Sequence, residues 1–462
     1  MIPERLQWLV RADGPSVELA ELFRARDLEI YLVGGSLRDA LLGRVPSDLD
    51  FATNARPEQI KDVVKGWADA TYGIGEQFGT IGVRKGDLVH EITTFRDEIY
   101  RDDSRKPEVT YSDDIETDLS RRDFTINAMA LRLPDAHLVD PFGGLADLAR
   151  RQLRTPLAPD VSFTDDPLRM LRLFRFVSTI GFVPDEATLT AVSGMADRLE
   201  IVSAERIRDE FSKLMTGEHV TDALWGLIHS GLADHFIPEL PLLKMEQDPV
   251  QFHKDVLAHT IAVVDKTEPR LVLRLAALLH DIGKPATREF GPGGVMFHHH
   301  EVVGARMARE RLRALRYEGR IVEDVSKLVF MHLRPHTFKM GWSDSAVRRY
   351  VRDAGPLLED LNQLVRCDVT TASSVRALKI QRRIDELEGC IADLLEREEL
   401  ASIRPPIDGH TVMRHLGIDP GPLVGEIMDV LLEHRLDHGP YSEEEALELV
   451  DEWAERKGMG GP

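Results

Sequence analysis

Cysteine and long apolar runs are both scarce in this chain of 462 residues. Its two cysteines, Cys367 and Cys390, supply neither a disulfide framework nor the paired thiolates of a zinc site. No apolar segment is long enough to cross a bilayer, because LVLRLAALLH at 271–280 is short and is interrupted by Arg274. A secretory signal pattern is also lacking. We therefore expect a protein of the reducing cytoplasm without a membrane partner.

Positive charge is in deficit as well. The chain has 58 Lys and Arg against 79 Asp and Glu, which gives a formal net charge of −21. Such a surface does not bind nucleic acid nonspecifically, so any RNA site must be local. Residues 150–176 carry six arginines against three aspartates, and this segment is a candidate for contacts with phosphates.

The most informative segment is 31–54, YLVGGSLRDALLGRVPSDLDFATN. Its first apolar residues predict a buried strand, Gly34 and Gly35 a tight turn, and Ser36 the cap of an amphipathic helix. Backbone amides at such a helix start attract anions, and glycine lets the backbone approach phosphate oxygens closely. Arg38 adds a cation one turn later. The segment therefore predicts a site for a nucleotide triphosphate.

Asp48 and Asp50 follow in the same segment, two positions apart in a strand-like pattern. Residues two apart in a strand point to the same side, so both carboxylates face one place. Mg²⁺ prefers carboxylate and phosphate oxygens, and a pair of such ions can activate an attacking oxygen and stabilise a leaving one. A D-x-D pair alone is more often a solvated turn, but the GGxxRD pattern upstream favours a metal site. The glycine pattern matches neither a P-loop nor a dinucleotide fold.

Four further motifs follow in order: RRDFTINAMAL at 121–131, DPFGGLADL from Asp140, DDPLRMLRLFRF from Asp165 and ERIRDEF from Glu205. The nucleotidyltransferase superfamily that includes DNA polymerase β has similar successive motifs, and the chain most resembles the bacterial CCA-adding tRNA nucleotidyltransferases and their poly(A) polymerase relatives. The resemblance covers about the first half of the chain. It rests on these four motifs together with the segment 31–54.

The resemblance implies roles for several of these residues. Glu91, in the strand-like LVHEITTFR, corresponds to an acid on a neighbouring strand that completes the metal site; the alternative is a surface Glu on an edge strand. Arg122 and Asp123 would contact the triphosphate and the ribose, with Asn127 bracing the site. An Asp that accepts from the 2′-OH favours ribonucleotides. Asp123 can also act as a helix cap.

The same family reads the incoming base with protein side chains, and here the resemblance gives that role to Asp166 and Arg169. Cytosine and adenine each present an amino donor beside a ring-nitrogen acceptor, so one Asp acceptor and one Arg donor suit both. Guanine and uracil present the reversed order. Pro167 predicts a helix start, and Arg172 and Arg175 continue the arginine spacing as further nucleotide-binding candidates.

A second set of residues resembles the H...HD...D pattern of HD-domain phosphohydrolases. It comprises His259, His280 and Asp281 in LLHDIGKP, and Asp368 in LVRCDVTT. A mixed nitrogen and oxygen set suits Mn²⁺, Ni²⁺, Co²⁺ or Mg²⁺ rather than a thiolate zinc site. Some HD modules are structural, so hydrolysis stays open at this point. Two further histidines are candidate ligands: His300 and His332.

The segment 97–120 is charged and poor in apolar residues, which predicts a mobile loop beside the active site. Nearly everything beyond residue 155 has helical patterns. We predict an α+β fold: a polymerase-β-like nucleotidyltransferase head with a mixed sheet, followed by all-α neck, HD and tail domains. The predicted domains are 1–150 for the head, 151–248 for the neck, 249–375 for the HD domain and 376–462 for the tail.

The resemblance predicts an enzyme that adds CMP, CMP and AMP from CTP and ATP to the 3′ end of tRNA, without a template, by transfer at paired Mg²⁺ ions. One alternative is a poly(A) polymerase of the same family, although those proteins tend to have a basic C-terminus. Another is an HD phosphohydrolase whose N-terminal half only binds RNA. We expect no DNA partner, and the sequence does not predict the oligomeric state.

Overall fold

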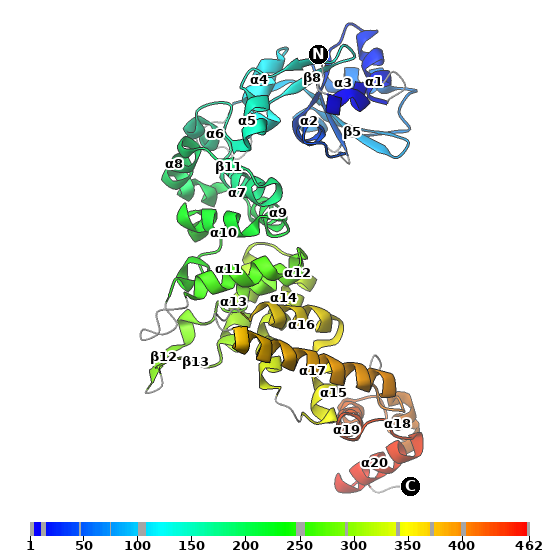
Figure 1. Ribbon diagram of the computed structural model, residues 1–462. Helices are drawn as coiled ribbons and strands as arrows, with labels where there is room; N and C mark the ends of the chain where they lie inside the picture. Colours follow the sequence, from blue (N-terminus) through cyan, green and yellow to red (C-terminus); the bar gives the residue numbers. More distant parts are fainter. Residues whose placement is uncertain are drawn as a thin grey trace. The chain divides into compact units, whose positions relative to one another are not determined.

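The computed structural model describes residues 4–10, 15–45, 48–73, 75–99, 108–245, 255–291, 294–338, 342–369, 374–398 and 403–459. The chain folds into two compact units, Met1–Pro241 and Leu242–Pro462 (Figure 1). None of the described helices is both long enough and apolar enough to cross a membrane.

A seven-stranded mixed sheet forms the core of the N-terminal half of the first unit (Figure 1). Only β2 and β5 run parallel among its neighbouring strands. β1, with the sequence IYLV, is buried along its whole length, as expected for a strand covered on both faces. The mixed sheet confirms the predicted fold class. In spatial order the strands are β3 (Ala70–Tyr72), β4 (Thr80–Lys85), β5 (Leu88–Thr94), β2 (Leu49–Thr53), β1 (Ile30–Val33), β8 (Ala130–Leu133) and β9 (His137–Val139).

The helix α2 (Gly34–Leu41) follows β1 without a linker. Gly34 has a φ of +68°, a left-handed conformation that favours glycine. A Cβ at this position would lie 3.1 Å from Nη1 of Arg122, so the Arg122 side chain would have to shift to accommodate a larger residue. The predicted cap by Ser36 is wrong, because the N-cap residue is Val33 and the Ser36 side chain is used elsewhere. Its hydroxyl donates to the carbonyl of Asp48 and accepts from the amide of Asp50, which ties α2 to the start of β2.

The segment 97–120, expected to be a mobile loop, has regular structure where it is described. EVTY pairs with the strand before it, as its β-branched and aromatic residues favour, and Asp114 caps the next helix by accepting from two amides of the first turn. The loop prediction is therefore wrong for 108–120, while residues 100–107 lie outside the described residues. The elements are β6 (Arg96–Ile99), β7 (Glu108–Tyr111) and α4 (Ile115–Ser120).

The rest of the first unit is mostly helical, as predicted, with a short parallel ladder between β10 (Gln152–Leu153) and β11 (Val183–Pro184) in addition. Pro167 is the N-cap residue of α7, in agreement with the predicted helix start. α7 buries an apolar face, including Leu171 and Phe174, and packs against α9 and α10. The elements used below are η3 (Thr125–Asn127), α6 (Pro159–Asp165), α7 (Leu168–Ile180), α9 (Ala204–Met215) and α10 (Val220–His229).

The described part of the second unit is also mostly helical, and in it β12 (Arg288–Gly291) pairs antiparallel with β13 (Gly294–Phe297). The apolar segment that includes Arg274 forms the buried helix α12. The helices of this unit are α11 (Val256–Lys266), α12 (Leu271–Leu279), α13 (His300–Ala314), α14 (Gly319–Met331), α15 (Asp344–Ala354), α16 (Leu358–Cys367), α17 (Ser374–Glu398), α18 (Gly409–Leu416), α19 (Pro422–His438) and α20 (Glu443–Arg456).

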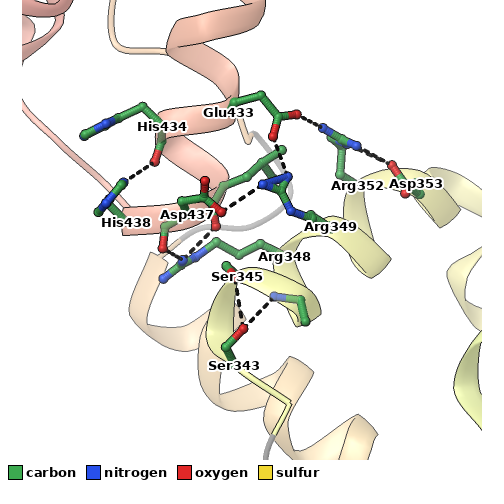
Figure 2. Close-up of polar contacts among 12 residues, drawn as sticks. Ser343, Ser345, Arg348, Arg349, Arg352, Asp353, Glu433, His434, Asp437 and His438 are labelled. Carbon is green, nitrogen blue, oxygen red and sulfur yellow. Dashed lines mark hydrogen bonds and ion pairs between the residues drawn. The ribbon is translucent and has the colours of Figure 1, made fainter. Parts of the chain in front are cut away.

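Arginines of α15 join three helices of the second unit. Figure 2 shows Arg349 between Glu433 and Asp437 of α19, at 2.7 and 2.8 Å. Arg348 donates to the carbonyl of Leu436 at 3.0 Å, near the C-terminal end of α19 where backbone carbonyls lack helical partners. The same guanidinium pairs with Glu398 of α17 at 2.8 Å. The buried Arg348–Glu398 pair and the more exposed contacts of Arg349 together join α15, α17 and α19.

Candidate active site

A cavity of about 940 Å³ lies in the first unit, between residues of the sheet and of the helices that follow it. Many of the sequence-predicted residues line it, although they come from segments more than one hundred positions apart. Asp48 is exposed at the start of β2 and is not among the lining residues. Arg38 and Arg175 line a different, smaller cavity. The predicted residues that line the large cavity are Gly34, Gly35, Asp50, Glu91, Arg122, Asp123, Asn127, Asp166, Arg169 and Arg172.

Asp50 and Glu91 are directly opposite each other on the parallel strands β2 and β5. Burial, and then the charges of Asp48 and Glu91, raise the pKa of Asp50 to about 6. The side chains therefore concentrate negative charge at one place in the cavity. Hard divalent cations favour carboxylate oxygens, and a bound cation would neutralise this charge. The donor set thus fits a metal such as Mg²⁺.

Asp118 holds two arginines that line the same cavity as the Asp50 and Glu91 carboxylates. This carboxylate is fully buried and pairs with Arg121 at 2.7 Å and with Arg122 at 2.9 Å. Burial alone would raise the pKa of Asp118, but the charges of Arg122 and Arg121 hold it below its usual value. Because both guanidiniums also line the cavity, Asp118 fixes two cations in a place suited to phosphate oxygens.

Asp123 lies at the junction of the sheet and α7. One carboxylate oxygen accepts from the amide of Phe124 at 2.8 Å and from the side-chain amide of Asn127 at 2.9 Å. The other oxygen lies 2.7 Å from Nη2 of Arg172. Burial opposes ionisation, but Arg172 and Asn127 lower the pKa of Asp123 to about 2. Asp123 is thus a fixed anionic acceptor; the N-cap residue of η3 is Phe124.

The Asp166 and Arg169 side chains are both restrained by hydrogen bonds within the protein. Asp166 accepts from the amide of Leu168 at 3.2 Å through one oxygen and from Arg206 at 2.7 Å through the other. Arg169 donates to Oγ of Ser162 at 2.9 Å, and a second nitrogen donates to the carbonyl of Arg121. An acceptor and a donor are therefore presented in fixed orientations.

Sequence reasoning missed Arg121, Arg206 and Asp118, and it also missed the aromatic side of the cavity. Tyr72 and Phe78 line the cavity and are both partly exposed. Arg206 lies within ERIRDEF, one of the motifs that carry the family resemblance, but the motif alone assigns its residues no role. Spacing alone gives no sign that α9 brings this arginine to Asp166.

The four predicted HD residues converge in the second unit. Nε2 of His259 lies 2.9 Å from Oδ1 of Asp368 and 3.5 Å from Oδ2 of Asp281. Nε2 of His280 lies 3.2 Å from Asp281. Burial would lower the pKa of His280, but Asp281 and Asp368 raise it to about 10, which shows how negative this place is.

His300 and His332, the two further candidate ligands, lie close to the four predicted HD residues. Ligand atoms form two sets within 4.8 Å, one of His259, His280 and Asp368 and one of Asp281, His300 and His332. No other such set occurs in the described part of the chain, and Asp48, Asp50 and Glu91 are less tightly gathered. The chemistry of these donors fits a divalent transition metal.

Three family models match the chain in succession. They are the Poly A polymerase head domain over residues 30–154, the probable RNA and SrmB-binding site of polymerase A over 181–243, and the HD domain over 256–373.

Known proteins are similar over nearly the whole chain. The A-adding tRNA nucleotidyltransferase of Deinococcus radiodurans is 32% identical over 438 residues, which cover 92% of this chain and 95% of that protein. The CCA-adding enzyme of a Geobacillus strain is 29% identical over 426 residues, 92% of either chain. The crystal structure of Bacillus stearothermophilus CCA-adding enzyme in complex with CTP has a TM-score of 0.70 at 23% identity, covering 99% of this chain and 100% of that one. The chain therefore belongs to the family of tRNA nucleotidyltransferases with a poly A polymerase head domain and an HD domain.

Proposed function

We propose that the first unit adds CMP, CMP and AMP, from CTP and ATP, to the 3′ end of tRNA without a nucleic-acid template. The observation that carries the proposal is the large cavity, in which Asp50 and Glu91 share a lining with the restrained pair Asp166 and Arg169. A nucleoside triphosphate needs both features, one at its phosphates and one at its base. The two full-length relatives support the same reaction class.

The triphosphate is assigned to the turn at Gly34 and Gly35 and to the two arginines tethered by Asp118. Backbone amides at the start of α2 and the guanidiniums of Arg121 and Arg122 can donate to phosphate oxygens. Arg38 and Arg175 are left out of this set, because they line the other cavity. Asp123 is assigned to the ribose 2′-OH and Asn127 to bracing Asp123, an arrangement that favours ribonucleotides.

The base is assigned to Asp166 and Arg169. The existing bonds of Arg169 to Ser162 and Arg121 use three of its five N–H groups, so donors remain for a ring nitrogen. Asp166 would accept from the exocyclic amino group of cytosine or adenine. Uracil and guanine would leave these polar groups without partners. Such a mismatch can reduce the use of the wrong nucleotide by about 10⁴-fold.

In the transfer step, the 3′ hydroxyl of the RNA releases its proton to solvent and its oxygen forms a bond to the α-phosphorus, while the bond from the α-phosphorus to the oxygen bridging to the β-phosphorus breaks and pyrophosphate leaves. Asp50 and Glu91, together with Asp48, would hold Mg²⁺. When bound, paired Mg²⁺ ions would activate the attacking hydroxyl and neutralise the leaving pyrophosphate. The chain's own contribution is to orient the nucleotide through the contacts above and so bring its α-phosphate to the carboxylates.

Addition of AMP alone is the second candidate for the same site, because the Deinococcus relative is named for that activity. Two substrates separate the candidates: tRNA that lacks all of CCA, and tRNA that ends in CC. Addition of the whole CCA predicts that the first substrate gains two nucleotides with CTP and three with CTP and ATP together. Addition of AMP alone predicts that only the second substrate is extended. A long ladder with ATP alone would indicate a poly(A) polymerase, and no extension of either tRNA would refute the proposal.

For the second unit we propose a metal-dependent phosphohydrolase within the predicted HD domain, 249–375. His259, His280, Asp281 and Asp368 would hold a divalent metal, which would acidify a water and polarise a phosphate ester. The chain's side chains set the position of that metal, and Lys284, 2.7 Å from Asp281, adds a cation suited to a phosphate oxygen.

The hydrolysis test uses phosphomonoesters and cyclic nucleotides with Mn²⁺, Ni²⁺, Co²⁺ or Mg²⁺. We expect that replacing His280 and Asp281 together by alanine abolishes metal-stimulated hydrolysis and leaves tRNA extension unchanged, whereas His410→Ala, an exposed histidine, changes neither. A parent protein that binds none of these metals and hydrolyses none of these esters would make the second unit a scaffold. We place the protein in the cytoplasm, a reducing compartment in which the free thiols of Cys367 and Cys390 are stable.

A further inference from the structure

Three cations converge on the second cavity of the first unit, which has a volume of about 260 Å³. Arg38 comes from α2, Arg175 from α7 and Lys213 from α9, so three separate elements build it. The described lining contains no carboxylate. The remaining lining residues are Phe176, Thr179 and Thr216.

Both arginines of the lining lie against the buried ring of Phe176. Cζ of Arg175 lies 4.1 Å from the ring centroid, and Cζ of Arg38 lies 5.2 Å from it. Each guanidinium has one carboxylate partner outside the lining, Asp39 for Arg38 at 2.8 Å and Glu210 for Arg175 at 3.1 Å. The two cations therefore stay close to each other while parts of both face the cavity.

Lys213 adds a charge that no side chain neutralises. Its side chain is exposed, and in the described ranges of the chain it has no hydrogen bond or ion pair. Burial, and then the charge of Arg172, lower the pKa of Arg175; Glu210 and Asp123 oppose this shift, and Arg38 adds a smaller repulsion to it. An anion in the cavity would relieve that repulsion, and a net charge of −21 over the chain makes such a positive place unusual.

The lining selects phosphate over a base or a sugar. The Phe176 ring carries the guanidinium of Arg175 and meets Phe124 edge to face, so it offers no open surface on which a base can stack. Both threonine hydroxyls already donate to backbone carbonyls, Thr179 to that of Arg175 and Thr216 to that of Ser212. Only the cations remain as donors, and they read charge rather than sequence.

We infer that this cavity binds a backbone phosphate of the RNA substrate and so positions the RNA next to the nucleotide cavity. The link is direct, because Arg38 also donates to Asn127 at 2.8 Å, and Asn127 lines the large cavity. The inference rests on the proposed function for the identity of the RNA, but its test needs no catalysis.

The experiment measures the dissociation constant of the full-length protein for tRNA lacking CCA, without nucleotide, over a range of KCl concentrations. Lys213→Ala should weaken binding about 3- to 10-fold at low salt and reduce the slope of log Kd against log salt by about one, since one phosphate contact is lost. Lys213→Glu should weaken binding further. The matched control is Lys65→Ala, an exposed lysine away from both cavities, which should behave as the parent.

A slope that stays at the parent value in both Lys213 variants would overturn the inference. So would a higher KM for CTP and ATP with an unchanged Kd for tRNA, because the cavity would then serve free nucleotide or pyrophosphate. A changed slope in a protein that adds no nucleotide would refute the proposed function and leave the phosphate site standing. Thermal unfolding of the Lys213 variants checks that they are folded, and we expect the parent midpoint because the side chain has no partner to lose.

Discussion

Arg206 donates a hydrogen bond to Oδ2 of Asp166 across 2.7 Å, from α9 to the residue between α6 and α7. The other oxygen of Asp166 already accepts from the amide of Leu168. The carboxylate is therefore fixed in rotation by two donors on different elements, and its remaining lone pairs have set directions. We regard Arg206 as a positioning residue for the reading of the base.

Arg206→Ala should raise the KM for both CTP and ATP about 10-fold and reduce the preference for CTP over UTP, because a carboxylate free to rotate no longer presents one acceptor direction. Arg206→Lys should restore part of the preference. The measurement is the ratio of incorporation for each nucleotide on the same tRNA. Arg208→Ala, on the same helix but outside the cavity lining, is the control, and an Arg206→Ala enzyme with the selectivity of that control would contradict the role.

Asp118→Asn should weaken nucleotide binding without removing any residue that contacts the nucleotide. Arg121 and Arg122 then lose the carboxylate that neutralises them. Largely buried charges without a partner should lower the free energy of unfolding by about 3 kcal/mol. We expect a higher KM for CTP and ATP and a lower unfolding midpoint. The control is Asp113→Asn, whose carboxylate is 82% exposed in its pair with Arg56 and should contribute little. Equal KM values for the two variants would show that Asp118 has no part in binding.

We expect low pH to weaken the packing of α15, α17 and α19, the three helices that Glu398 joins. Hydrogen bonds from Arg348, and then from Arg435, lower the pKa of Glu398 below its ordinary value of 4.5. The ionised form is thus stabilised in the folded state, so this contribution is complete above about pH 4.5 and is lost as the pH falls through the lowered pKa. Glu398→Gln should lower the free energy of unfolding by about 3 kcal/mol at pH 7. It should also make the loss of stability at low pH, the acid limb of the curve, less steep. Unfolding midpoints measured from pH 7 to pH 3, with the exposed Glu396→Gln as control, test this; an acid limb as steep as that of the parent would refute it.

The order of motifs was enough to predict the mixed sheet and to identify most of the cavity lining. Asp50, Arg122, Asp123, Asp166 and Arg169 lie in short segments whose residue types already carry the chemistry. These residues come together only because the fold places β2, η3 and α7 next to one cavity. The family resemblance predicts that fold, whereas local sequence patterns do not.

Other relations depend on packing that the sequence does not encode locally. Ser36 looks like a helix cap, yet its hydroxyl bonds to the backbone of 48–50, because β2 returns beside α2. The pattern around Arg38 predicts a contact with phosphate, yet Arg38 contacts Asp39 and the Phe176 ring and lines the second cavity. In each case a partner lies outside the local motif, and the spacing of residues within a motif does not predict such a contact.

The most direct test of the account is a single-turnover measurement of CMP addition by Asp50→Asn on tRNA that lacks CCA. The substitution keeps the size of the side chain and removes the charge that would hold Mg²⁺, so the rate should fall by about 10³-fold or more, equivalent to several kcal/mol of lost transition-state stabilisation. Asp87→Asn, which changes an exposed aspartate in the turn between β4 and β5 outside the cavity lining, should react at the parent rate. An Asp50→Asn enzyme that adds CMP as fast as the Asp87→Asn enzyme would place the chemistry elsewhere.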